Sequence, residues 1–514
     1  MKINIKKIIC FMILGLFLIS TNALAMKIAK NETELKIIKD TNDNYDPLVN
    51  LKVTVKINEI RTLDKIDMLS DPDFYVKVFI DDQVYTSETW NNQKYVKPNW
   101  SATCDVNDYK DYVNIRIQLW DANPGRDTLC DISQNVGQVY PRSYDVDLNY
   151  SLKTGHWDGE DFIHPNSVYF DPSGYGRLNG CDDNSIYEND KDCELWFDIT
   201  QTDYDGDGIP YWTEVYEFGT DPKVDDTGKD YDEDGIPIEW EFKWGYYQTY
   251  NWHEKKYEDI WFYHPCKWDD HKNIDEEDDG LDNVEEYLTS QWGSDPFRRD
   301  LFIELDQMVE GPQGEHASIL PNGSKILLID AHHRHNIVYH MDDGCMGGSD
   351  WIPFDYWTEH EELQDIYFNY FLHGDKDNWR RGVFHYGIIV YDATYSGFCF
   401  DSGDKCYGGA FQMSSVRMDN KNLLHTDWYR DINYAGGYMH ETGHTLGLNG
   451  FLIGGHDRDS YYPWQYNFWK FQAYKSCMNY RYVFKIVDYS DGSNGLNDFD
   501  DWEHIDLSLF QDDV

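Results

Sequence analysis

The chain has 514 residues, and its 44 Lys and Arg against 94 Asp and Glu give a formal charge of −50. Aromatic residues make up 16% of it, which excludes a disordered acidic chain, and the excess of acid excludes a nucleic-acid binder because such a protein needs a basic surface. A folded chain with so many carboxylates needs counter-charge, for which divalent cations are the obvious candidates.

The first 25 residues have the pattern of a secretory signal peptide. Lysines precede an apolar run from Ile8 to Ile19, and the small residues around Ala23 and Ala25 mark a cleavage site. The alternative is an uncleaved membrane anchor, for which the run is short. We therefore expect a secreted protein in which residues 26–49, which are polar and carry no period, form a linker.

Secretion affects the interpretation of the cysteines. The chain contains no Cys-x-x-Cys pair, so a zinc site made of thiolates is not expected. Cys181 with Cys193, and Cys399 with Cys406, are close enough in sequence to be candidates for local disulfides in an oxidising compartment.

Residues 50–200 are expected to form a β-sandwich. Apolar and polar residues alternate from Leu51 to Ile57, over 75–80 and over 113–120, and Asp, Asn and Gly separate these segments. Alternation with a period of two, bounded by turn residues, is typical of strands in such a fold.

Carboxylates gather at two strand junctions of this segment, in Ser70-Asp71-Pro72-Asp73-Phe74-Tyr75-Val76-Lys77-Val78 and in Trp120-Asp121-Ala122-Asn123. With Pro98-Asn99-Trp100, these motifs resemble a C2 domain over about residues 50–150. The resemblance implies contact with a membrane or another surface, and calcium ligands at one end of the sandwich, namely Asp67, Asp73, Asp121 and Asn123. Asn123 stands where the family usually has Asp, and ordinary Asp-rich turns are the alternative.

Three twelve-residue loops follow within residues 201–297. Each has carboxylates at positions 1, 3, 5 and 12, a glycine at position 6 for a sharp turn, and an aliphatic residue at position 7. This is the spacing of a calcium-binding loop. The expected ligands are Asp203, Asp205, Asp207, Ile209 and Glu214; Asp230, Asp232, Asp234, Ile236 and Glu241; and Asp275, Glu277, Asp279, Leu281 and Glu286. Because a strand precedes the first loop, the segment resembles thrombospondin type 3 or dockerin-like repeats, with one helix after each loop.

The last segment, residues 298–514, contains His440-Glu441-Thr442-Gly443-His444. On a helix, residues four apart share a face, so His440 and His444 can bind one Zn²⁺ while Glu441 reaches the water on the metal. The hydrophobic pattern predicts strands at 300–306, 337–343 and 384–390, and a helix at 326–335. The other histidines are expected to have core or surface roles: His332, His333, His335, His340 and His385.

Two further motifs extend this pattern. Gly447 follows the histidine pair, and Ser476-Cys477-Met478-Asn479-Tyr480 comes some thirty residues later. Together they resemble the metzincin zinc peptidases, which implies an α+β catalytic domain with Met478 beneath the metal and Tyr480 close to it. The resemblance implies hydrolysis of a protein or peptide by a zinc-activated water, with Glu441 as general base and Tyr480 as a donor to the oxyanion.

One position departs from that family. The third ligand, usually His, is expected at the third residue after the glycine, but Gly450 occupies it. The nearest substitutes are His456 and Asp457, and we favour His456 as the third zinc ligand.

The sequence therefore predicts a multidomain protein made of a C2-like β-sandwich, a calcium-loop segment and an α+β metzincin-like domain. The expected function is that of a secreted zinc endopeptidase stabilised by calcium. The alternative is a non-catalytic, calcium-dependent surface-binding or adhesion protein with a degenerate protease domain.

Overall fold

The computed structural model describes residues 45–67, 70–133, 144–159, 176–181, 191–251, 253, 255–401, 406–449, 454–457 and 460–510. The predicted signal peptide at 1–25 and most of the linker at 26–49 lie outside these residues. Every helix of the described part is too short or too polar to span a bilayer.

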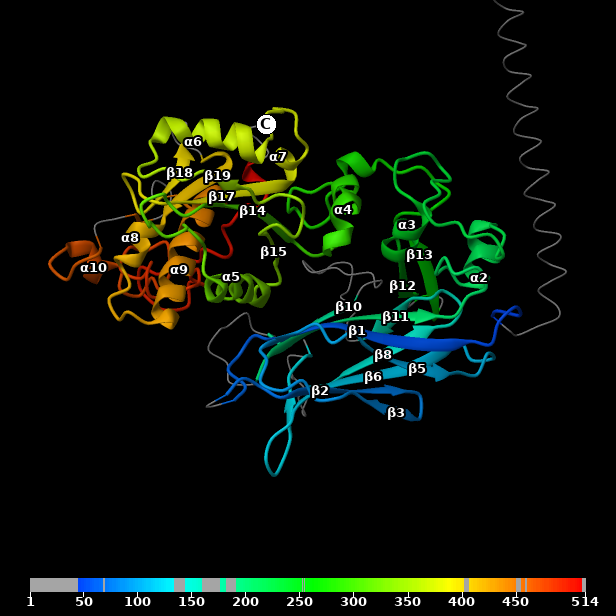
Figure 1. The fold of residues 1–514 in the computed structure, drawn as a ribbon. Helices are drawn as coiled ribbons and strands as arrows, with labels where there is room; N and C mark the ends of the chain where they lie inside the picture. The colour runs from blue at the N-terminus through cyan, green and yellow to red at the C-terminus, as the bar shows by residue number, and fades with distance from the viewer. Residues whose placement is uncertain are drawn as a thin grey trace, which may run out of the picture.

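Two sheets form a β-sandwich at the start of the described chain (Figure 1). The first contains β1 (Lys52–Thr62), β4 (Tyr95–Val96), β5 (Trp100–Asp105), β10 (Gly176–Asn179) and β11 (Cys193–Gln201). The second contains β2 (Phe74–Ile80), β3 (Gln83–Thr86), β6 (Tyr112–Asp121), β7 (Thr128–Cys130), β8 (Val146–Ser151) and β9 (Trp157–Gly159).

The sandwich core follows the alternation in the sequence. Val53, Val55 and Ile57 of β1 are fully buried against Ile115 and Ile117 of β6, while the residues between them are more exposed. This period-two pattern buries one face of each sheet, as predicted for a sandwich. Strand β11 pairs with the whole length of β1 and brings the chain out at Gln201, next to the first predicted calcium loop.

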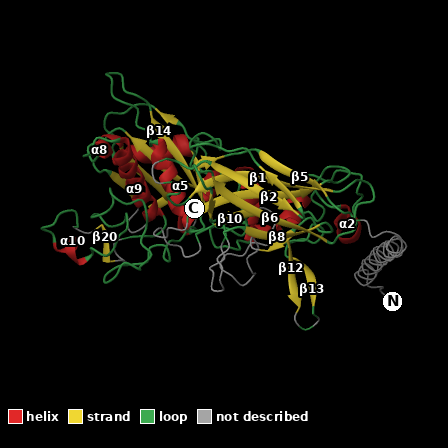
Figure 2. Cartoon of the chain, turned by 90° about the horizontal axis from the view of Figure 1, so that it is seen from below, coloured by secondary structure: helices red, strands yellow, loops and turns green. Residues whose placement is uncertain are grey.

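The calcium-loop segment has little regular structure. A short helix follows each loop, as expected. The elements are α2 (Tyr211–Thr213), η1 (Glu214–Phe218), α3 (Ile238–Trp244), β12 (Tyr246–Asn251), β13 (Lys256–Trp261), η2 (His271–Asn273), α4 (Asn283–Thr289) and η3 (Ser290–Trp292). The β12–β13 hairpin projects from the body of the molecule (Figure 2). A small aromatic core around Trp240, Tyr263 and Phe297 joins the second and third loops.

The C-terminal segment is built on a sheet in the order β15-β14-β17-β19-β18, in which only the edge strand β18 runs antiparallel to its neighbour. Its strands are β14 (Asp300–Met308), β15 (Val338–Asp342), β16 (Trp351–Ile352), β17 (Phe384–Val390), β18 (Gly397–Asp401) and β19 (Cys406–Ser414). Strand β20 (Gly454–Asp457) lies outside this sheet. The helices are α5 (Asn322–Arg334), α6 (His360–Ile366), η4 (Tyr367–Phe371), α7 (Arg380–Val383), α8 (Ser415–Asp419), α9 (Asp427–Thr445) and α10 (Tyr466–Lys470).

Helices cover both faces of this sheet (Figure 1). Leu301, Ile303 and Leu305 of β14 belong to the core under α5 and α9, whereas Phe302 and Met308 belong to the core with α6 and η4. Strand β14 is buried at every position, as expected for a central strand of a parallel sheet that is covered on both faces.

A buried network of charged groups joins the sandwich to α5. Arg61 of β1 contacts Asp330 of α5 at 2.8 Å, and Glu194 of β11 pairs with Arg177 of β10 and with His333 of α5. Burial alone would raise the pKa of Glu194, but Arg177 and His333 hold it well below its usual range. The carboxylate therefore remains charged, between Arg61 and Arg177 of the sandwich and the ring of His333 from α5.

The candidate disulfide between Cys181 and Cys193 is not formed, since both are free thiols. Cys193 is fully buried in the sandwich core beside Cys130, whereas the Cys181 sulfur lies 3.6 Å from the carboxylate of Asp192. The side chains of Cys399 and Cys406 lie outside the described part of the structure.

We expect Glu194→Ala to lower the free energy of unfolding by about 3–5 kcal/mol, because Arg177 would remain buried without a counter-charge. Chemical denaturation in the presence of calcium measures this. The matched control is Asp147→Ala, which breaks an exposed pair with Arg116 and should cost less than about 1 kcal/mol. Equal losses for the two variants would contradict the role assigned to the network.

The same network has a pH dependence with a defined sign. Because the pKa of Glu194 is lower in the folded chain than in the unfolded chain, its stabilisation is complete above the ordinary carboxyl pKa of about 4.3 and is lost as the pH falls below it. The acid-unfolding profile of Glu194→Gln should be flatter than that of the wild type over this range.

Candidate metal centres

Helix α9 carries the two histidines of the predicted zinc motif. The Thr426 hydroxyl caps its first turn by accepting a hydrogen bond from the Tyr429 backbone amide. Near its end, a Cβ atom at Gly443 would lie 2.6 Å from the Met478 sulfur, so glycine is needed for the helix to lie this close to the loop around Met478. Met478, which the sequence predicts beneath the metal, is fully buried against this end of the helix.

Backbone carbonyls orient both imidazole rings. Nδ1 of His440 donates to the carbonyl oxygen of Cys477 at 2.9 Å, and Nδ1 of His444 donates to that of Leu448 at 2.7 Å. Because a carbonyl only accepts, the proton of each neutral ring is on Nδ1, and Nε2 keeps a lone pair. Such outer hydrogen bonds are typical of histidines that bind metals.

The third group at this centre is Asp457 on β20. Its Oδ1 lies 3.1 Å from Nε2 of His440, and its Oδ2 lies 3.3 Å from Nε2 of His444. The ligand atoms of the three residues all lie within 4.8 Å of one another, which fits one cation. Asp457 has a φ of 45°, a left-handed conformation that Asp tolerates better than most residues.

His456, which we favoured from the sequence, is not at the centre. Its ring is fully buried on the other side of β20, with Nε2 3.0 Å from Oδ1 of Asp501. The contacts of the two side chains thus lie on opposite sides of β20, and only Asp457 faces the histidine pair. Asp457 therefore replaces His456 in the candidate ligand set.

The charges at this centre are balanced within the chain. Burial lowers the pKa of His440, but its contact with Asp457 outweighs this and raises the pKa to about 9. Burial likewise opposes the effect of the two histidines on Asp457, whose pKa nevertheless lies well below its usual range. A metal ion bound here would displace the proton of His440, as expected for a site whose ligands must be deprotonated.

Glu441 lies beside the ligands and against the edge of the sheet. Its side chain is 8% exposed, and burial raises the pKa of its carboxyl group. A Cβ atom at Gly397, the first residue of β18, would lie 2.0 Å from Oε1 of Glu441. The absence of a side chain at Gly397 therefore makes room for this carboxylate next to the edge strand.

Tyr480 also lies close to the histidines. Its ring stacks on that of His440 with centroids 5.6 Å apart, and Tyr461 stacks on its other face at 4.5 Å. Burial and the nearby carboxylate of Asp457 raise the pKa of Tyr480 well above its usual value. The phenol therefore keeps its proton and can donate a hydrogen bond.

The three predicted calcium loops share one backbone geometry. The first carboxylate of each loop, from Asp203, Asp230 or Asp275, accepts a hydrogen bond from the position-6 glycine amide at 2.9–3.2 Å. These glycines have φ values of 86°, 107° and 95°, which favour glycine over other residues. Carboxylate oxygens from positions 1, 3 and 5 lie within 4.8 Å of one another in the first two loops.

The closing glutamates of these loops are buried among other acids. Burial, with added repulsion from neighbouring aspartates, raises the pKa of Glu214 to about 9 and that of Glu241 to about 10. Both carboxylate oxygens of Glu241, Glu277 and Glu286 are buried and have no hydrogen-bond partner within the described structure. At neutral pH such carboxyl groups are either protonated or neutralised by a bound cation, and the calcium-loop spacing favours the cation.

The structure adds one carboxylate to each loop that the sequence did not indicate. In each loop, Oδ2 of the position-5 aspartate accepts a hydrogen bond from the backbone amide of a distant aspartate. Asp226 donates to the first loop at 3.2 Å, Asp269 to the second at 3.2 Å, and Asp300 to the third at 2.6 Å. Asp226 also shares a candidate cation position with Asp207 and Glu214. The separations of 19, 35 and 21 residues differ, so no fixed spacing could have identified these residues.

The predicted residues at the end of the sandwich are also near one another. Oδ1 of Asp121 accepts a hydrogen bond from the Asp73 amide at 2.9 Å, and its Oδ2 accepts one from the Asn123 side chain at 2.6 Å. Burial raises the pKa of Asp121, and the charge of Asp67 raises it further. Asn123 thus stabilises the charged form of Asp121 by donating to it, whereas an aspartate at this position would have added a second negative charge.

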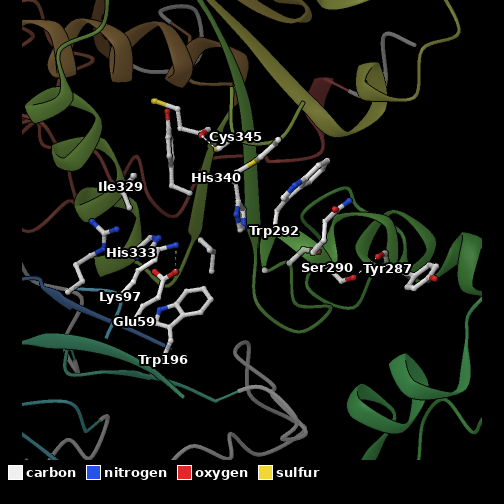
Figure 3. A pocket seen from close by; sticks show the side chains of 18 of the residues that line it. Glu59, Lys97, Trp196, Tyr287, Ser290, Trp292, Ile329, His333, His340 and Cys345 are labelled. Atoms are coloured by element: carbon white, nitrogen blue, oxygen red, sulfur yellow. Dashed lines mark hydrogen bonds and ion pairs between the residues drawn. The ribbon is translucent and has the colours of Figure 1, made fainter. Parts of the chain in front are cut away.

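A cavity of about 730 Å³ lies where the sandwich, the calcium-loop segment and the C-terminal segment meet (Figure 3). Glu59 and Trp196 of the sandwich, Trp292 of the calcium-loop segment, and His333 and His340 of the C-terminal segment line it. His440, Glu441, His444 and Asp457 are not among the described residues that line it, so this cavity is separate from the candidate zinc centre.

Comparison with known proteins identifies one part of the chain. Residues 51–147 match the C2 domain family. Similar solved structures include a C2 domain (11% identity, 30% of this chain and 98% of that chain, TM-score 0.19). Human GIVD cytosolic phospholipase A2 is also similar, with 14% identity over 29% of this chain and 16% of that chain (TM-score 0.19). Two calcium-bound C2 domains of Extended-Synaptotagmin 2 are similar with 13% identity over 30% of this chain and 46% of that chain (TM-score 0.18).

No curated protein matches the chain. The matched region of the phospholipase is about a sixth of its length. The family match coincides with the observed sandwich, whose strands β1 to β8 cover the same residues. Residues 51–147 of this chain are therefore a C2 domain.

Proposed function

We propose that the protein is a secreted, calcium-stabilised, zinc-dependent endopeptidase. The observation that carries the proposal is the convergence of His440, His444 and Asp457 on one point beside the carboxylate of Glu441. Two imidazoles and one carboxylate are a donor set that suits zinc, and three protein ligands leave one position for water, as catalytic zinc sites require. Secretion is proposed from the pattern of residues 1–25.

When bound by these three residues, zinc would supply a Lewis acid and lower the pKa of a water molecule. In the proposal, Glu441 takes the proton of that water, and its raised pKa, which brings it closer to the working range of a general base, supports this role. Tyr480 keeps its proton, which supports its proposed role as a donor to the oxygen that becomes negative as the peptide carbonyl is attacked.

Strand β18 offers a way to position an extended substrate. In the described strand order, β18 is the edge strand of the sheet. Because Gly397 has no side chain, the backbone of this strand lies directly against the carboxylate of Glu441. An extended peptide could add to the edge through backbone hydrogen bonds, as peptides do in other strand-addition complexes. Its scissile bond would then lie beside the general base.

The calcium loops and the C2 domain have supporting roles in this proposal. Calcium bound by the loops would neutralise buried carboxylates and stabilise the folded chain, because it binds only the native arrangement. The C2 domain would provide contact with a membrane or another surface. The C2 match also favours a second candidate function, a calcium-dependent surface-binding protein without catalysis, which the Glu441 variant below distinguishes from the first.

We expect Glu441→Gln to keep the fold and the bound zinc but to lower peptide hydrolysis by roughly 10²–10⁴-fold, since the amide cannot accept a proton from water. Hydrolysis of a casein or peptide substrate measures this, with zinc content determined in parallel. Glu503→Gln is the matched control, because Glu503 is exposed on the same segment, and it should leave activity unchanged. Unchanged hydrolysis in Glu441→Gln would exclude the proposed mechanism, and no hydrolysis by the wild type would favour the second function.

Asp457→Asn should lower the zinc content of the purified chain, whereas His456→Gln should leave it unchanged. The reason is that Asp457 faces both histidines while His456 faces Asp501. His456→Gln should instead lower the melting temperature, because it removes a buried partner of Asp501. Elemental analysis and thermal melting separate the two effects, and loss of zinc in His456→Gln alone would restore the sequence-based choice.

Removal of calcium by a selective chelator that leaves zinc in place should lower the melting temperature and expose residues 202–296 to proteolysis. Each pair of like charges at about 4 Å costs roughly 4 kcal/mol at an effective dielectric constant of about 20, and calcium reverses this repulsion. Asp203→Asn with Asp205→Asn should reproduce part of the loss. Asp82→Asn with Asp105→Asn, two exposed positions on the sandwich, should not. Identical melting and cleavage with and without calcium would show that the loops are not structural calcium sites.

A further inference from the structure

We propose that Asp234, Glu241 and His271 form a second transition-metal site, which binds an ion of the Zn²⁺ class within the calcium-loop segment. This site is separate from the centre at His440 and His444, and the inference does not depend on peptidase activity. It rests on the position of one histidine, His271, that lies outside the spacing of every calcium loop.

The three side chains converge in a fully enclosed place. Nε2 of His271 lies 3.2 Å from Oδ2 of Asp234 and 3.9 Å from Oε1 of Glu241, and the side chains of all three residues are 0% exposed. Their ligand atoms lie within 4.8 Å of one another. These distances are suitable for three ligands of one cation placed between them.

Two of the three side chains at this point, Glu241 and His271, have buried polar atoms without a hydrogen-bond partner among the described residues, whereas Oδ2 of Asp234 already accepts from the Asp269 amide. Neither oxygen of Glu241 nor Nε2 of His271 has a hydrogen-bond partner within the described structure. An unpaired carboxylate and an unpaired ring nitrogen that are both shielded from water are costly for the fold. A cation bound by both would satisfy them together.

Comparison with the first loop indicates which kind of cation. There the corresponding position is formed by oxygen ligands only, from Asp207, Glu214 and Asp226. In the second loop, Asp269 matches Asp226 in its backbone hydrogen bond, and the candidate cation position is formed by Asp234, Glu241 and His271.

This exchange of an oxygen ligand for a nitrogen ligand changes the metal preference. Ca²⁺ and Mg²⁺ select oxygen ligands, whereas imidazole suits zinc and other transition metals. Asp234 and Glu241 each have two carboxylate oxygens, so they can also contribute to the calcium position of the second loop.

The surroundings of His271 fix the ring in place. It lies edge-on to Trp240 and Tyr263, with ring centroids 5.9 and 5.1 Å away, and the side-chain amide of Asn283 lies 2.9 Å from Nδ1. In this arrangement Nδ2 of Asn283 is the atom next to Nδ1, so Nδ1 accepts and Nε2 carries the proton of the neutral ring. Metal binding at Nε2 therefore requires the Asn283 amide to turn over, so that its oxygen accepts from Nδ1–H and Nε2 has a free lone pair. The site would then link η2, where His271 lies, to α3, where Glu241 lies.

The test uses the full chain with His440→Ala and His444→Ala, so that the first centre cannot bind metal, in saturating Ca²⁺. Titration with Co²⁺, followed by its visible absorption, should show one equivalent bound. Zn²⁺ should displace it, whereas millimolar Ca²⁺ and Mg²⁺ should not. Adding His271→Asp, which restores the oxygen-only ligand set of the first loop, should abolish the Co²⁺ absorption while calcium still raises the melting temperature.

Three results would overturn the inference: no Co²⁺ absorption in the His440→Ala, His444→Ala chain, displacement of Co²⁺ by calcium, or unchanged binding in the His271→Asp chain. His271→Gln, which keeps a neutral side chain of similar size, is a second variant should His271→Asp fail to fold, and it should also lose the absorption. Failure of the proposed peptidase centre would be visible separately, as a wild-type chain whose zinc content does not change on His440→Ala.

Discussion

Electrostatic repulsion between buried carboxylates is the constraint on which the middle of this molecule depends. The three loops and the aspartates that join them place acids closer together than hydrogen bonding alone can satisfy. The third loop is tied directly to the C-terminal sheet, because Asp300, the first residue of β14, donates its amide to Asp279 and accepts a hydrogen bond from His340. A change in the charge of the third loop would therefore act directly on the first residue of β14, a central strand of the sheet.

The candidate zinc centre depends instead on the direction in which helix and strand side chains point. Helix α9 supplies two ligands on one face because they are four residues apart, and β20 supplies the third because its successive side chains face opposite sides. The loop around Met478 supports both, through the carbonyl of Cys477 and the close contact with Gly443. Segments far apart in the sequence thus fix one small group of atoms from three directions.

Features set by local spacing could be predicted from the sequence, whereas features set by tertiary contacts could not. The sandwich strands, the loop ligands and the histidine pair follow from local periodicity or fixed spacing, and the structure places them as those patterns indicate. The choice between His456 and Asp457 depends on the phase of a four-residue strand, which no spacing from Gly447 defines. Asp226, Asp269 and Asp300 reach their loops over different numbers of residues, and His271 reaches its place only after the chain has passed through the β12–β13 hairpin. Such contacts depend on tertiary folding.

The charged network around Glu194 has a geometric consequence for the proposed function. Arg61, Arg177 and Glu194 belong to the sandwich, while Asp330 and His333 belong to α5, which packs against α9. A buried junction of this kind resists hinge motion, because opening it would separate charges that have no access to water. A C2 domain resting on a surface would therefore hold the histidine pair at a fixed height and angle above that surface. Peptide bonds would then be selected by their distance from the surface as well as by their sequence.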